Sequence, residues 1–230
     1  MPSSRLWDML LNRSPALEEL SIDGHSVNPI DAHRLIQGRW PYLRKLTLGD
    51  VVVDLHSSTT TQRDQKPQYI QFLEAHPKIQ SLRTPRHISP RDLSYFSPSS
   101  LPHLTEFSGT LEQLQSLTSD PTPFPSSPSP QNIKKTLQTI TFHEPMLMRD
   151  ATPLVISGLL RGLQNLRVLK VSFVLQTMYE SGNLLRGVVG CCPRLEVLEL
   201  GCGCKPPFLL VSLIHSFNHF YFLGTPVGST

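Results

Sequence analysis

The sequence has no cysteine before Cys191, and all four of its cysteines lie between residues 191 and 204. A small secreted domain held by disulfides spreads its cysteines along the chain, so this distribution argues against such a framework. The opening residues, MPSSRLWDMLLNRSP, also lack the long apolar core of a signal peptide. We therefore expect a reducing compartment, cytoplasmic or nuclear.

Charge is scarce and scattered. Only 17% of the residues are charged, the net charge is +3, and Lys and Arg form no long run, so no nucleic-acid partner is expected. The most apolar stretch, 207–223, is shorter than the roughly 20 residues that span a bilayer and contains polar side chains. We expect no membrane partner, and we expect this tail to form a final helix over an open core end or to fit the fold poorly.

The motifs of common catalytic sites are also missing. The chain contains no G-x-S-x-G, no G-x-x-x-x-G-K-[ST] and no H-E-x-x-H. His143-Glu144 is followed by Pro145, which would break the helix that a zinc-protease motif needs. The nine histidines are dispersed, and His76 and His103 lie beside prolines. The sequence therefore predicts no enzyme, no catalytic residue, no metal site and no cofactor.

Proline is abundant, with 21 residues, and many prolines precede a repeated frame of the form apolar-x-x-apolar-x-apolar. The clearest copies are PALEELSI, PYLRKLTL and PRLEVLEL, and the looser ones include PKIQSLRT and PHLTEFSG. Copies recur about every 25–35 residues, the period of leucine-rich repeats or slightly longer. Their first apolar positions are Leu17, Leu43, Ile79, Leu104, Leu137, Leu166 and Leu195.

The frame has a direct structural interpretation. Alternation over its last four positions predicts a short strand with one buried face. Helix-like segments precede most copies, and proline stops the helix or sets the turn into the strand. These segments are residues 6–11, 31–40, 69–76, 152–163 and 181–191. The sequence thus predicts an α/β fold, a leucine-rich-repeat-like solenoid of about seven irregular repeats with parallel strands and outer helices. Thr84 and Gly109 replace the last apolar residue in the third and fourth copies, where we expect shallow or irregular strands.

Composition divides the chain into segments. Residues 1–117 hold four repeats, interrupted by a polar stretch at 54–68 that predicts a mobile loop, and 133–204 hold the last three. Between them, 118–132 is a Pro/Ser-rich insert, and 205–230 is an apolar tail. The insert contains Thr122-Pro123, Ser127-Pro128 and Ser129-Pro130. These dipeptides suit proline-directed kinases, although an unmodified flexible insert fits the same composition.

The clustered cysteines allow two interpretations. Cys191 and Cys192 end a helix-like segment, and Cys202 and Cys204 follow the last predicted strand. Zinc sites favour cysteine pairs separated by about two to four residues, whereas these pairs are adjacent or separated by one. Small buried thiols are the first interpretation. A zinc-bound or redox-active module built from the four is the second.

Strand geometry predicts one functional surface. Because side chains alternate across a strand, the polar positions between the buried ones share the concave face of the solenoid. Its middle row would be Ser21, Thr47, Arg83, Ser108, Thr141, Lys170 and Glu199. Small polar side chains with a few charges suit a protein partner. The predicted protein-binding residues are Ser21, Lys45, Thr47, Arg83, Ser108, Thr141, His143, Lys170 and Glu199.

Four segments, LLNRSPALEELSIDG, FLEAHPKIQSL, LPHLTEFSGTLEQLQSL and CPRLEVLEL, resemble the irregular leucine-rich regions of F-box-type proteins of basidiomycete fungi. The resemblance covers roughly residues 5–204. It implies a non-catalytic substrate-recognition region of a ubiquitin ligase component, in which an F-box docks on the ligase adaptor and the repeats hold the substrate. No F-box-like segment precedes Leu6, so the adaptor is an expected partner only where an F-box is present. A truncated or degenerate repeat fragment without function is the alternative.

Overall fold

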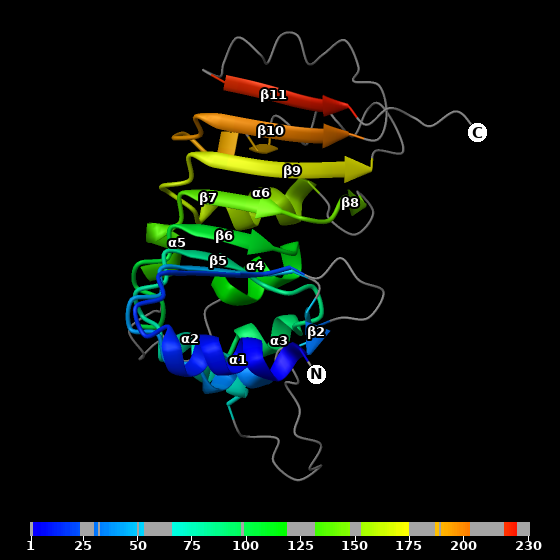
Figure 1. Ribbon diagram of the computed structural model, residues 1–230. Coiled ribbons are helices and arrows are strands. Elements are labelled where there is room, and N and C mark those ends of the chain that lie inside the picture. The colour runs from blue at the N-terminus through cyan, green and yellow to red at the C-terminus, as the bar shows by residue number, and fades with distance from the viewer. Residues whose placement is uncertain are drawn as a thin grey trace, which may run out of the picture. The chain divides into compact units, whose positions relative to one another are not determined.

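Every copy of the repeated frame contains a strand in the computed structural model (Figure 1). The structure describes residues 2–23, 30–31, 33–49, 51–52, 66–97, 99–118, 132–147, 153–174, 187–188, 190–202 and 219–224. The strands of the seven copies are β1, β3, β5, β6, β7, β9 and β10, and each begins just after the first apolar residue of its copy. The placement of the strands was therefore correctly predicted from the frame.

The chain forms two compact units, Met1–Thr136 and Leu137–Thr230. In the first unit, four strands lie side by side and parallel, in the order β1 (Glu19–Ile22), β3 (Lys45–Leu48), β5 (Ser81–Arg83) and β6 (Glu106–Gly109). A second small parallel sheet joins β2 (Ile30–Asp31) and β4 (Val51–Val52). The helices are α1 (Pro2–Arg13), the 3-10 helix η1 (His33–Gln37), α2 (Gln68–Glu74), α3 (Pro90–Leu93), α4 (Leu111–Thr118) and α5 (Asn132–Thr136).

The second unit repeats this design. Its strands lie parallel in the order β7 (Thr139–Phe142), β9 (Val168–Val174), β10 (Val197–Cys202) and β11 (His219–Gly224). The short strand β8 (Met146–Leu147) also pairs with β9, and α6 (Pro153–Arg161) precedes β9 in the chain. Parallel strands joined through helical connections confirm the predicted α/β class.

The apolar positions of the frame form the core of each unit. In the first unit Leu20, Leu46, Leu82 and Phe107 are register partners on adjacent strands, and all four are buried. In the second unit Ile140, Leu169 and Leu198 form the matching row. Full burial of such a side chain contributes about 1.5–3 kcal/mol. Strands of only a few residues are thus stabilised by the neighbouring repeat rather than by themselves.

The prolines set a recurring turn rather than ending helices directly. The first apolar residue of the frame donates its backbone N–H to the carbonyl three residues earlier, at 3.0 Å for Leu43 and Trp40 and 3.2 Å for Ile79 and His76. In five of the six turns proline follows the accepting residue, in the favoured second position of such a turn, and Gln164 takes this position after Leu163. The accepting residues of the six turns are Ser14, Trp40, His76, Leu101, Leu163 and Cys192, and all except Ser14 are buried.

One of these turn residues is a buried histidine. His76 is 2% exposed; its Nδ1 lies 2.6 Å from the Phe72 carbonyl, and its Nε2 accepts the Trp40 backbone N–H at 3.0 Å. These partners require the neutral ring with the proton on Nδ1. Burial lowers the pKa of His76, with a smaller lowering by Arg39, against the raising effect of the Phe72 carbonyl. His76 is therefore a hydrogen-bonded turn residue.

The expected irregularity of the third and fourth strands is half right. The strand β5 is short and stops before Thr84, whereas β6 is as long as β1 and β3 and includes Gly109. The prediction failed for β6 because a polar cluster replaces the missing apolar side chains. A Cβ on Gly109 would lie 2.6 Å from both Gln113 Oε1 and Thr84 Oγ1, so the absence of a side chain there makes room for the amide.

The centre of this cluster is Gln113, whose side chain is completely buried. Its Nε2 donates to the carbonyls of Pro85 and Ile88 at 2.9 and 3.1 Å. Its Oε1 accepts from Thr84 Oγ1 at 2.8 Å and from the Thr110 backbone N–H at 3.0 Å. Thr110 Oγ1 in turn accepts the Gln113 N–H at 3.2 Å. Thr110 and Gln113 thus form a capping box at the start of α4. The side-chain amide of Gln113 also donates hydrogen bonds to the loop after β5.

Three other expectations need correction. The helix predicted over 31–40 is only the short η1, and the segments α3 and α4 were not predicted as helices. The 3-10 helix ends at Gln37, and the next residue, Gly38, packs against the indole of Trp40, where a Cβ would lie 2.2 Å from a ring atom. Residues 219–224 of the tail form the strand β11 and not the predicted final helix.

Other expectations lie largely outside the described residues. These are the predicted loop up to residue 65, the insert at 119–131 with Thr122, Ser127 and Ser129, and Cys204. Within the described part of the chain, no helix has the length and apolar character needed to cross a membrane.

Candidate functional site

The predicted binding residues of the first unit lie on one face of its sheet, which we call the first polar face: Ser21, Lys45, Thr47, Arg83 and Ser108. Ser21, Thr47, Arg83 and Ser108 are register partners on successive strands. All of them are exposed or half-buried, while the residues on either side along each strand are mostly buried. Adjacent parallel strands are about 4.8 Å apart, so these side chains form one continuous row.

The charges of the first polar face are already paired. Arg83 Nη1 lies 3.5 Å from Asp23 Oδ2, an ion pair that reaches from β5 to the end of β1. Lys45 Nζ lies 4.0 Å from Glu19 Oε2, its register partner. A Cβ on Gly49 would lie 1.7 Å from Asp23 Oδ1, so the glycine makes room for this carboxylate. Among the remaining members of the row, Ser21 and Thr47 carry uncharged hydroxyl groups.

The second polar face consists of Thr141, Lys170 and Glu199 in the second unit. They are register partners on β7, β9 and β10, and all three are half-buried. Lys170 Nζ lies 2.8 Å from Glu199 Oε2. A Cβ on Gly201 would lie 2.2 Å from Ser172 Oγ, so the strands are packed closely beyond this pair.

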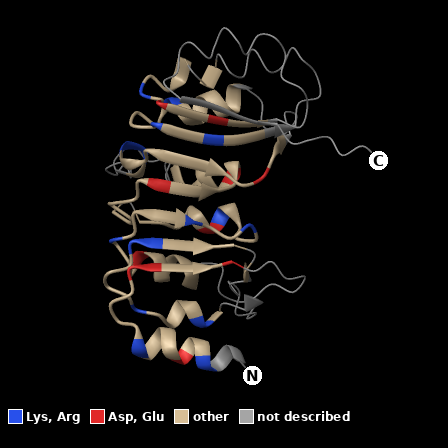
Figure 2. Cartoon of the chain, turned by 45° about the horizontal axis from the view of Figure 1, so that its top comes forward, with Lys and Arg blue, Asp and Glu red and all other residues tan. Residues whose placement is uncertain are grey.

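The ninth predicted binding residue, His143, follows β7 and lies outside the strand row. Figure 2 shows basic and acidic positions together on the strands of each unit. The structure thus brings the predicted strand residues of each unit together on one face. The charged residues among them form ion pairs. Sequence reasoning missed the pairing because the partners Asp23 and Arg83 are far apart in the sequence.

The cysteine question is answered in part by the recurring turn. Cys192 is 4% exposed and occupies the same turn position as Trp40, His76, Leu101 and Leu163. Burial, and then the neighbouring Cys191, raise its pKa to about 12, which keeps the thiol protonated. A buried protonated thiol is a poor nucleophile and a poor metal ligand. Cys191 and Cys192 are both free, and the side chains of Cys202 and Cys204 lie outside the described set.

Chemistry of other kinds is not evident in the described residues. No group of three or more His, Cys, Asp or Glu side chains there could hold a metal ion. The described clusters are hydrogen-bonded pairs and networks that join neighbouring repeats. One of these networks surrounds Glu74, and sequence reasoning did not find it.

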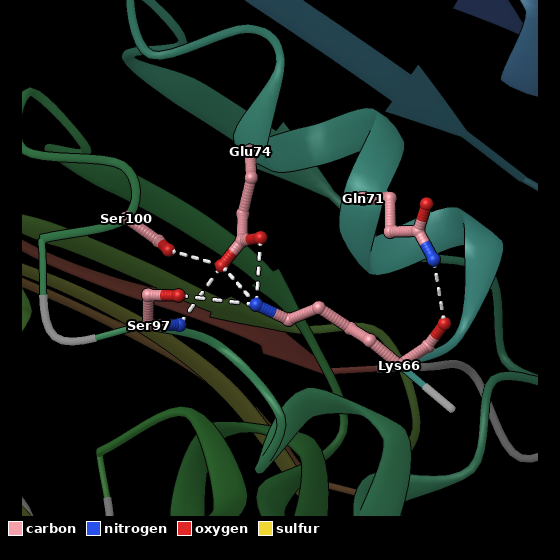
Figure 3. A network of polar contacts seen from close by, with 5 residues as sticks. All are labelled: Lys66, Gln71, Glu74, Ser97 and Ser100. Carbon is pink, nitrogen blue, oxygen red and sulfur yellow. Dashed lines mark hydrogen bonds and ion pairs between the residues drawn. The ribbon is translucent and has the colours of Figure 1, made fainter. Parts of the chain in front are cut away.

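Glu74 at the end of α2 collects a network of donors (Figure 3). Lys66 Nζ lies 2.7 Å from both carboxylate oxygens, Ser100 Oγ donates to Oε1 at 2.6 Å, and the Ser97 backbone N–H donates to Oε1 at 2.9 Å. Burial alone would raise the pKa of Glu74, but these hydrogen bonds outweigh it and lower the pKa to about 2. The carboxylate therefore ties Lys66 and the 97–100 segment to α2.

Glu74→Gln is expected to lower the free energy of unfolding at pH 7 by about 2 kcal/mol, because the amide cannot form the ion pair with Lys66. The folded-state pKa is lowered, so the stabilisation by Glu74 is fully present above its ordinary pKa of 4.5 and is lost as the pH falls towards 2. Urea denaturation of both proteins at several pH values would show the difference shrinking over this window.

Glu196→Gln is the matched control. Glu196 Oε1 lies 3.2 Å from Arg167 Nη1, with both side chains about half exposed, 52% and 55%. An exposed pair of this kind contributes little, so the control is expected to stay within about 0.5 kcal/mol at every pH. An equal cost for both variants would show that the Glu74 network adds no more than a surface ion pair.

Comparison with known proteins adds no relative. No family model, no curated protein and no solved structure matches the chain.

Proposed function

We propose that the chain is a non-catalytic protein-interaction scaffold built as a leucine-rich-repeat-like solenoid. The substrate-recognition region of an F-box-type ubiquitin ligase component is the role that best fits its resemblance to fungal repeat proteins. In this proposal the polar faces hold the partner protein, and the apolar rows only build the scaffold.

The observation that carries the proposal is the register of the polar rows. In each unit, side chains from successive repeats align into a row whose members are exposed or half-buried. Repeat proteins use such a row as a binding surface, because each repeat adds one contact to it. The recurring turn supports the repeat interpretation, since it returns the chain to the same strand position in six of the seven copies.

The paired charges suggest which contacts matter. A partner that bound through Arg83 or Lys170 would have to break an existing ion pair with Asp23 or Glu199. A hydroxyl group need not break an ion pair to bind a partner. It only replaces a hydrogen bond to water by a hydrogen bond to the partner. We therefore expect a partner to contact the first polar face through Thr47 and the second polar face through Thr141.

The proposal predicts that Thr47→Arg and Thr141→Arg each lower the affinity for the partner at least tenfold, because each places a long charged side chain on a polar face. Neither change removes a member of an ion pair of the faces. The measurement is proximity labelling in the source cells, followed by titration of the captured protein against the pure chain. Ligase adaptor and cullin subunits among the captured proteins would support the ubiquitin-ligase role.

Gln68→Arg and Gln164→Arg are the matched controls. Both glutamines are exposed, one on α2 and one in the turn before β9, and each control introduces the same side chain away from the polar faces. Controls should bind as the unmodified chain does. Equal losses in controls and face variants, with all variants folded, would refute binding through the polar faces. A folded chain that captures nothing would favour the fragment without function.

A further inference from the structure

Ser97 stands out among the Ser-Pro and Thr-Pro dipeptides of the chain. Four such dipeptides have a described first residue: Ser14-Pro15, Thr84-Pro85, Ser89-Pro90 and Ser97-Pro98. Thr84 is 2% exposed and belongs to the Gln113 cluster, and Ser14 and Ser89 are half-buried at a turn and at the start of α3. Of these four, only Ser97 is exposed, and it lies outside any helix or strand.

The hydroxyl of Ser97 also faces a ready phosphate partner. Lys66 Nζ donates to Ser97 Oγ at 3.0 Å while it contacts both Glu74 oxygens at 2.7 Å (Figure 3). A phosphate carries about −1.5 to −2 charges and three acceptor oxygens. Placed on Ser97 Oγ, it would lie beside both the lysine that attracts it and the carboxylate that repels it.

We propose that Ser97 is a phosphorylation site for a proline-directed protein kinase, and that its phosphate competes with Glu74 for Lys66. In the transfer, Ser97 Oγ forms a bond to the γ-phosphorus of ATP as the bond to the bridging oxygen breaks. ADP leaves, and the hydroxyl proton passes to the base of the kinase. The modified serine draws Lys66 towards the phosphate and repels Glu74, and this repulsion weakens the tie between the 97–100 segment and α2.

The first test is phosphate mapping by mass spectrometry after the folded full-length chain is incubated with ATP and a proline-directed kinase. We expect phosphate on Ser97, none there in Ser97→Ala, and little there in Pro98→Ala, which keeps the hydroxyl but removes the recognised proline. Ser89→Ala is the control and should leave modification of Ser97 unchanged. Both alanine variants at the site keep the backbone N–H of Ser97 that bonds Glu74, and circular dichroism would verify their folding.

Absence of phosphate from Ser97 in the folded chain would overturn the proposal, provided that the kinase modifies a standard peptide in the same reaction. So would modification that occurs only after the chain has been denatured.

The second test asks whether the phosphate acts through Glu74. Phosphorylation is expected to lower the midpoint of thermal unfolding by roughly 2–4 °C in the unmodified sequence. In Glu74→Gln the like-charge repulsion is gone and the phosphate has Lys66 to itself, so the same modification should leave the midpoint unchanged or raise it. An equal decrease in both backgrounds would overturn the competition for Lys66.

Discussion

Trp40→Ala is expected to lower the free energy of unfolding by about 3–5 kcal/mol, the largest effect of any single substitution proposed for this protein. Trp40 is 1% exposed and packs edge-on against Phe72, with ring centroids 6.2 Å apart. Its indole N–H donates to the Leu10 carbonyl of α1 at 3.1 Å. Removal of the ring leaves a cavity among α1, the recurring turn and α2, and leaves that carbonyl without its donor.

Urea denaturation followed by circular dichroism would measure this effect. Tryptophan fluorescence is unsuitable because the substitution removes a fluorophore. Trp40→Phe separates the packing of the ring from the hydrogen bond, because it keeps an aromatic ring but loses the indole N–H. Its loss of unfolding free energy should exceed that of a volume-conserving core substitution by about 1–2 kcal/mol. Tyr42→Ala in the same turn is the control, because Tyr42 is 51% exposed and contacts only the Lys78 ammonium over its ring among the contacts described. Tyr42→Ala should lower the free energy of unfolding by about 0.5–1 kcal/mol. If Trp40→Ala were as stable as Tyr42→Ala, the burial of the indole would not stabilise the fold as predicted.

Gln113→Leu is expected to be the second most destabilising change, by about 3 kcal/mol. Leucine has a similar size, so the loss comes from the hydrogen bonds and not from a cavity. Thr84 Oγ1, the Thr110 N–H and the carbonyls of Pro85 and Ile88 would all lose their bond to the amide. A buried polar group without a partner costs about 1–3 kcal/mol, and partial relaxation keeps the total below the sum of the four.

Gln113→Glu tests the same cluster through pH. The new oxygen would face the two carbonyls that Nε2 now bonds, and burial raises the pKa of such a carboxyl. Its folded-state pKa then exceeds its unfolded-state pKa, so the variant loses stability as the pH rises and comes closer to the unmodified protein in acid. Glu112→Gln, at an exposed neighbouring position of α4, should stay within about 0.5 kcal/mol. Equal stability of Gln113→Leu and this control would mean that the cluster contributes nothing.

The strands could be located from sequence because the signal is local and repeated. Each copy has its first apolar residue just before the strand, and alternation then assigns one face to the core and the other to solvent. The register of Ser21, Thr47, Arg83 and Ser108 follows from the same frame. Copies that align in sequence also align in space when each repeat pairs only with its neighbours.

Two departures from the sequence predictions, at Gly109 and at Arg83, depend on side-chain contacts. Gly109 indicated a weak strand, but the amide of Gln113 fills the space beside it and satisfies the surrounding groups. Arg83 was predicted to bind a partner, and the structure pairs it with Asp23. No periodic pattern reports a hydrogen bond of this kind, because it depends on side-chain placement after the strands have paired.

The sequence by itself determined the α/β class, the position of each strand in the seven copies, and the polar rows, because these depend on local alternation and on proline at recurring turns. Only the tertiary structure decided which polar side chains are available and which are used internally. It gave Cys192 and His76 their shared buried turn position, and it joined Lys66, Glu74 and Ser97 into one network. These contacts form only when the repeats stack. The separations in sequence of the residues that they join follow no single period, so the repeated pattern does not indicate them.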